Sequence, residues 1–169
     1  MDKMKFIRYF AYTIELFVVF MIQETPGLIP EILGAKPIIL IPAALSIALF
    51  ENETAGMIFG LYGGLLIDFG AGGIMGFHGL ILSVMCYIIG RMASDLIQTN
   101  FLTSMMVSLI CSGITVFLQF VFFYILYNYS HVFYALWAHY LPRFLYTAAI
   151  MPVTYYFNRA LFTQINDKE

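Results

Sequence analysis

The sequence predicts an all-α integral membrane protein, folded as a compact, single-domain bundle of about six transmembrane helices. Three observations support this prediction. Of the 169 residues, 62% are hydrophobic and only 11% are charged, and the mean hydropathy is +0.87. An average soluble domain carries roughly 25% charged residues. A soluble protein could not cover so much apolar surface with polar side chains, so the chain needs a lipid environment.

The first three elements follow from where apolar runs stop. The first segment, residues 6–23, ends before the loop that starts Glu24-Thr25-Pro26-Gly27. It resembles a signal sequence but lacks a small-x-small cleavage site, so we expect it to remain as a membrane helix. The second segment, residues 37–50, ends at the polar run 51–54, and the third covers residues 55–69.

The remaining segments are residues 77–93, 102–127 and 139–157. A helix needs ~20 residues at 1.5 Å each to cross the hydrocarbon layer. The segments 37–50 and 55–69 are short by this measure. We therefore expect them to be tilted, broken, or continued by interfacial residues.

The distribution of basic residues predicts the orientation. With six spans, both termini lie on the same side, and that side carries most of the Lys and Arg, as the positive-inside rule requires of the cytoplasmic face. Both termini are therefore expected in the cytoplasm, and the aromatic loop 128–138 outside. The net charge is −2 and the charged residues are scattered along the chain, which argues against nucleic-acid binding. The expected inner residues are Lys3, Lys5, Arg8, Arg91, Arg159 and Lys168, and the outer ones are Lys36 and Arg143.

Glycines spaced four apart define one face of the third segment. Gly56, Gly60 and Gly64 share this face, and Gly63 is expected to widen it. Because lipid provides no hydrophobic drive between helices, small residues that allow close backbone approach supply the contact. Two interpretations follow: tight packing within this chain, or a surface that receives a helix from another protein.

A glycine-rich turn follows this segment. Gly70, Gly72, Gly73 and Gly76 come directly after Asp68, which predicts an irregular re-entrant turn on the outer side. Irregular backbone at membrane depth is tolerated only when protein or a water-filled cavity surrounds it. We therefore expect residues 70–76 to lie inside the bundle.

Two acidic residues interrupt apolar segments. Asp68 requires a partner, and Arg143 is the basic residue at a comparable depth, so we hypothesise an Asp68–Arg143 pair. The alternative is an Asp68 capped by the loop glycines. Glu15 has no cation level with it, and three explanations are open: protonation, a hydrogen bond to a Thr or Tyr hydroxyl, or contact with a partner subunit.

The other polar residues suggest ordinary roles. Arg8, Arg91 and Arg159 are expected at the inner headgroups, with a weak Arg91–Asp95 pair. The three histidines have no neighbours at metal-ligand spacing, the two cysteines are interpreted as small buried hydrophobes, and nucleophile and phosphate-loop motifs are missing. We therefore predict no catalytic residues, no metal and no cofactor; these histidines and cysteines are His78, His131, His139, Cys86 and Cys111.

The run GLLIDFGAGGIMGFHGLILSVMCYIIG, residues 64–90, resembles the central signature of the MreD family of bacterial rod-shape proteins. That family similarly has a Gly-rich helix ending in Leu-x-x-Asp, then a short glycine-containing turn and a step into the next helix. The resemblance is specific over residues 56–92 and otherwise rests on hydropathy and length. The matching positions are Gly64, Leu65, Asp68, Gly72, Gly76, Phe77, His78 and Leu80.

The resemblance implies a non-enzymatic scaffold in the bacterial cytoplasmic membrane, within the cell-wall elongation complex. Its implied partners are the single-span protein MreC, the glycosyltransferase RodA, a class B penicillin-binding protein and, indirectly, MreB. The glycine face and the turn 70–76 are then the expected docking site. The alternative is a substrate-binding S-component of an energy-coupling-factor vitamin transporter, a family with similar architecture. S-components typically carry an alanine-rich small-xxx-small face on their first helix, which RYFAYTIELFVVF lacks.

Overall fold

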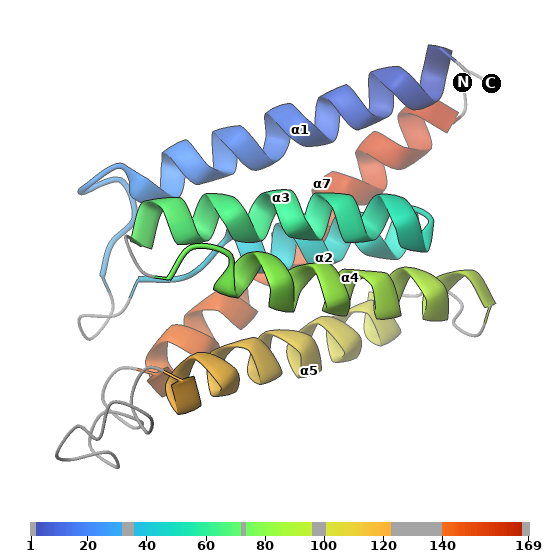
Figure 1. Ribbon diagram of the computed structural model, residues 1–169. Coiled ribbons are helices and arrows are strands. Elements are labelled where there is room, and N and C mark those ends of the chain that lie inside the picture. The colour runs from blue at the N-terminus through green and yellow to red at the C-terminus, as the bar shows by residue number, and fades with distance from the viewer. Residues whose placement is uncertain (1–2, 32–35, 72–73, 96–100, 123–139, 167–169) are drawn as a thin grey trace, which may run out of the picture.

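The computed structural model describes residues 3–31, 36–71, 74–95, 101–122 and 140–166, and these parts of the chain form six helices. The predicted all-α fold is confirmed. Gly72, the loop 128–138, His131 and His139 lie outside the described residues. The helices, labelled as in Figure 1, are α1 (Lys3–Glu24), α2 (Leu40–Phe50), α3 (Glu53–Ala71), α4 (Phe77–Asp95), α5 (Phe101–Phe120) and α7 (Leu141–Asn166).

Helix α2 is the centre of the bundle and contacts each of the other five described helices. Its ten residues from Leu40 to Leu49 are all buried. A helix that is apolar on every side belongs in a core. Its short length has the same cause, because a helix surrounded by protein has no need to match the thickness of the hydrocarbon layer.

The outer helices present apolar side chains to their surroundings. Helices α1, α4 and α5 contain stretches long and apolar enough to cross a membrane, namely Lys5–Glu24, Phe77–Ser94 and Phe101–Phe120. Large hydrophobic side chains such as Phe10 and Leu102 are 60% and 74% exposed. Such surfaces are stable against lipid chains and costly in water, which agrees with a membrane protein.

Figure 1 shows how the outer helices are placed around α2. Helices α3 and α4 run side by side and form the most extensive helix pair, and α1 and α5 lie on opposite sides of them. Helix α1 begins and α7 ends at the same end of the bundle. From that end the two helices separate, so the far half of α7 lies well away from α1.

Candidate functional site

The glycine face of α3 is filled by α4. A Cβ atom added at Gly60 would lie 2.6 Å from the carbonyl oxygen of Leu82, and one at Gly64 would lie 2.4 Å from that of His78. At Gly56 the nearest atoms, 3.1 Å away, belong to Ala48 and Cys86. These distances describe the close backbone approach expected for packing within the chain. The alternative, in which this face receives a helix from another protein, is wrong for these three glycines.

Gly63 lies on a different side of α3. A Cβ atom there would be 3.4 Å from the Cβ of Ala44 in α2 and 3.9 Å from the side chain of Leu16 in α1. It does not widen the α4 contact as expected, because a one-residue step turns the helix by about 100°. Gly63 instead lets α3 pack on α1 and α2.

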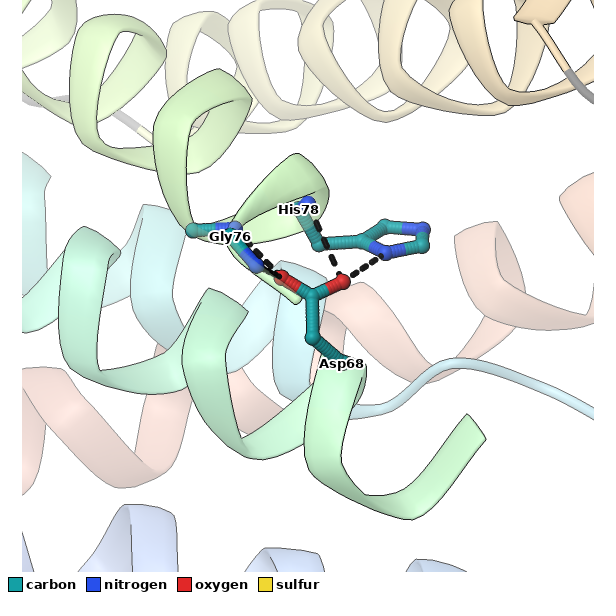
Figure 2. A network of polar contacts seen from close by, with 4 residues as sticks. Asp68, Gly76 and His78 are labelled. Carbon is teal, nitrogen blue, oxygen red and sulfur yellow. Dashed lines mark hydrogen bonds and ion pairs between the residues drawn. The ribbon is translucent and has the colours of Figure 1, made fainter. Parts of the chain in front are cut away.

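The turn between α3 and α4 is built around the carboxylate of Asp68, which is 3% exposed (Figure 2). The backbone N–H groups of Gly76 and Gly79 donate to its Oδ2 at 2.9 and 3.2 Å, and that of His78 donates to its Oδ1 at 3.1 Å. Gly76 has φ +93°, a conformation that favours glycine. The first turn of any helix has N–H groups without intrahelical partners, and here a side chain from the preceding helix accepts them.

The imidazole of His78 completes this cluster. Its Nδ1 lies 2.7 Å from Asp68 Oδ1 (Figure 2), and its Nε2 is buried without a hydrogen-bond partner among the described residues. A carboxylate oxygen can only accept, so Nδ1 carries the hydrogen. The side chain of Asp68 therefore has four donors from α4 and the turn that precedes it.

The predicted Asp68–Arg143 pair is wrong. The Nε of Arg143 donates to the backbone carbonyl of Lys36 at 3.2 Å, and no ion pair joins it to Asp68 within the described ranges. The physical reason is local. The N–H groups at the start of α4 have no intrahelical partner, lie next to the last turn of α3, and donate to the carboxylate of Asp68 in place of Arg143. The capping alternative is the one that the structure supports.

Glu15 is paired with the side chain of an asparagine. The Nδ2 of Asn158 in α7 donates to Glu15 Oε1 at 2.8 Å, and Asn158 is fully buried. Of the three explanations open for Glu15, the one with a Thr or Tyr hydroxyl is replaced by a side-chain amide of the same chain. Two acceptor oxygens remain buried with no donor in the described parts of the chain: Glu15 Oε2 and Asn158 Oδ1.

Near the shared end of α1 and α7, Arg8 is 8% exposed and forms an ion pair with Glu51, which follows α2. Its guanidinium also lies 5.0 Å from the ring centre of Phe162. Arg8 is therefore paired inside the bundle, with a partner that was not predicted from the sequence. Burial raises the pKa of Glu51 above its ordinary value, and the nearby guanidinium of Arg8 opposes this rise.

Two features of the buried polar interior were not found from the sequence. Asn158 lies one residue beyond the predicted end of the last apolar segment, and α7 in fact continues for two more turns. In α5, Ser104, Ser108 and Ser112 form a buried stripe of small residues. The four-residue spacing that identified the glycines would also have identified these serines. Within the residues searched, no group of three His, Cys, Asp or Glu side chains could hold a metal ion.

The chain matches a known protein family. A family described as rod shape-determining protein MreD matches residues 4–161 of this chain, from the first turn of α1 to near the end of α7. No curated protein and no solved structure matches.

Proposed function

This chain belongs to the MreD family of rod shape-determining membrane proteins, and we propose that it is a non-enzymatic scaffold of the bacterial cell-wall elongation complex. In this proposal it docks an MreC-like single-span protein in the bilayer and links that protein to RodA and a class B penicillin-binding protein, and indirectly to MreB. The observation that carries the proposal is the family match over residues 4–161.

The internal chemistry of the bundle supports a scaffold. The side chains of Asp68 and Arg8 are used in contacts that join α3 to α4 and α1 to the end of α2. Such contacts hold helices at fixed positions, and a partner needs a rigid surface. The apolar outer faces of α1, α4 and α5 supply the area on which membrane partners can pack.

The arrangement of the chain supports a multi-pass protein of the bacterial plasma membrane with both termini in the cytoplasm. Helix α1 begins and α7 ends at the same end of the bundle (Figure 1). The basic residues expected on the inner side include Lys3 and Lys5 near the start of α1. A partner that spans the membrane once would then run alongside the bundle through both leaflets.

Affinity purification from native membranes tests the proposal. The tagged full-length chain, solubilised in mild detergent, is expected to retain an MreC-like protein, and depletion of the chain is expected to convert rods into spheres. A tagged unrelated multi-pass protein is the control. Insertion of the chain without any such partner and without a shape defect would contradict the proposal, as would tight binding of a vitamin-like molecule to the purified chain alone.

A further inference from the structure

An open groove of about 660 Å³ runs between α1 and α7. Its α1 side is formed by apolar residues that include Ile14, Val18 and Ile22, and its α7 side by Val153 and Phe157 among others. Figure 1 shows that α1 and α7 meet at the end where α1 begins and α7 ends, and separate toward the other end.

The groove is elongated along α1 and α7. On α1 its lining extends from Ala11 to Ile22, and on α7 from Ile150 to Leu161. Eleven residue steps at 1.5 Å give roughly 17 Å, or about three helical turns, on each wall. A slot of this length, lined by exposed aliphatic side chains, can receive about three turns of a helix, a little over half of a transmembrane span.

The groove contains a hydrogen-bonding position. Glu15 is among its lining residues and is 9% exposed. One of its oxygens accepts from Asn158, whereas its Oε2 and Asn158 Oδ1 are buried acceptors with no donor in the described residues. An acceptor without a donor in an apolar environment is destabilising. Of these two oxygens, only Glu15 Oε2 belongs to a residue that lines the groove, so this is the oxygen to which an added donor is expected to bind.

The depth of Glu15 limits what can supply that donor. It lies twelve residues after the start of α1 at Lys3 and nine before its end at Glu24. At 1.5 Å per residue these steps are roughly 18 and 14 Å, so the carboxyl group lies near the middle of the bilayer. An acyl chain carries no donor at this depth, and a headgroup lies too far away. A second copy of this chain is not the expected occupant, because in a symmetric dimer built on this groove Glu15 would face a second Glu15 and not a donor.

We propose that the groove between α1 and α7 binds one transmembrane helix of a different protein, which presents a side-chain hydrogen-bond donor level with Glu15. This inference rests on the proposed scaffold function and places its single-span partner. A hydroxyl, amide or cationic side chain would supply the donor, and the aliphatic walls would pack against the rest of the helix. Helix association in lipid commonly combines such close packing with one interhelical hydrogen bond.

Site-specific photo-crosslinking tests the location. The photoreactive residue p-benzoyl-phenylalanine replaces Phe157, which lines the groove and is 52% exposed, or Phe10, a matched control on α1 that is 60% exposed and does not line it. With the full-length chain and the co-expressed MreC-like protein in native membranes, a protein–protein crosslink is expected from position 157 and not from position 10. The crosslink should map to the transmembrane segment of the partner.

Two substitutions test the chemistry and the shape. Glu15→Leu removes the acceptor and is expected to lower partner recovery on the order of 3- to 20-fold, while Glu15→Gln, which retains a hydrogen-bonding side chain of equal length, should lose less. Val153→Trp obstructs the groove and should also release the partner. Its control is Val84→Trp, on the exposed face of α4 and away from the groove.

The outcomes separate the two proposals. Partner recovery with crosslinks from position 10 and none from position 157 would overturn the groove and leave the scaffold function intact. Crosslinks from position 157 only to lipid, or to a second copy of the chain, would also overturn it. Failure of the unsubstituted chain to retain any MreC-like protein would contradict the scaffold function itself, and the groove assignment with it.

Discussion

Substitution of Gly64 by Ala should separate the two most closely packed helices. The added Cβ atom would lie 2.4 Å from the carbonyl oxygen of His78 and 2.5 Å from two backbone atoms of Gly79, and none of these atoms can rotate away. Relief to the 3.0 Å below which Cβ contacts essentially never occur requires a shift of at least 0.6 Å. The backbone N–H groups of His78 and Gly79 donate to Asp68 at 3.1 and 3.2 Å, and a further 0.6 Å would break both hydrogen bonds.

The expected destabilisation follows from these two effects. Overpacking of a core costs ~1–3 kcal/mol, and each lost hydrogen bond to a charged group costs ~1.5–3 kcal/mol. Because some relaxation will be shared with the turn, we expect a total at the low end of this range, about 4 kcal/mol. For a chain of this size that corresponds to a fall in Tm of roughly 8–16 °C.

Thermal unfolding in detergent, followed by intrinsic fluorescence or aggregation, measures this effect. Gly63→Ala is the matched control, because its Cβ atom would make ordinary contacts of 3.4 Å or more with Ala44 and Leu16. It should be neutral, or stabilising by up to about 1 kcal/mol through the higher helix propensity of Ala. Equal Tm values for the Gly63 and Gly64 variants would refute the backbone-contact argument.

Three further predictions follow from the buried polar groups. The exchange of Asp68→Arg with Arg143→Asp should rescue neither single substitution, because the two side chains have separate partners; a double variant with a Tm near that of the unsubstituted protein would contradict this. Burial raises the pKa of Glu51, so the folded state binds this proton more tightly than the unfolded state does. The free energy of unfolding should therefore fall as pH rises from the ordinary pKa of 4.5 through the folded-state pKa, and then level off. Glu51→Gln should remove this pH dependence, as unfolding measured over a pH series would report. Asn158→Leu should cost about 2–3 kcal/mol by leaving the Glu15 carboxyl with no donor, and Glu15→Leu in addition should recover much of it; a double-mutant cycle without coupling would argue against this pair.

The fold was predictable because lipid constrains a chain more strongly than water does. Every backbone polar group must be satisfied within its segment, so apolar runs bounded by polar residues become helices. The positions of α1, α3 and α4 follow from such boundaries. The end of α7 did not, since the hydropathy pattern fades at Asn158 and Arg159 while helical hydrogen bonding continues to Asn166.

The partners of the polar residues could be predicted only when they were local. Asp68 is close in sequence to the N–H groups of Gly76 and Gly79, and the capping alternative identified this contact. The partners of Glu15 and Arg8 lie 143 and 43 residues away. Such pairs depend on which faces of α1 and its neighbouring helices are in contact. In an apolar run, the sequence contains little information about which face of the helix contacts a neighbour.

The buried carboxylates of Asp68 and Glu15 differ in how many hydrogen-bond donors their own chain supplies to them, and this difference makes Glu15 the better candidate for binding a partner. Asp68 has donors for both oxygens, three from backbone and one from His78, so it fixes the turn before α4 and has little capacity for another partner. Glu15 has one donor for two oxygens and lies in the open groove between α1 and α7. In a bundle whose other residues along this groove are largely apolar, an unsatisfied acceptor is stabilised when a partner supplies the missing donor. Glu15 in α1 is therefore the stronger candidate for binding a partner. The glycine-rich motif that indicated the family instead stabilises the fold.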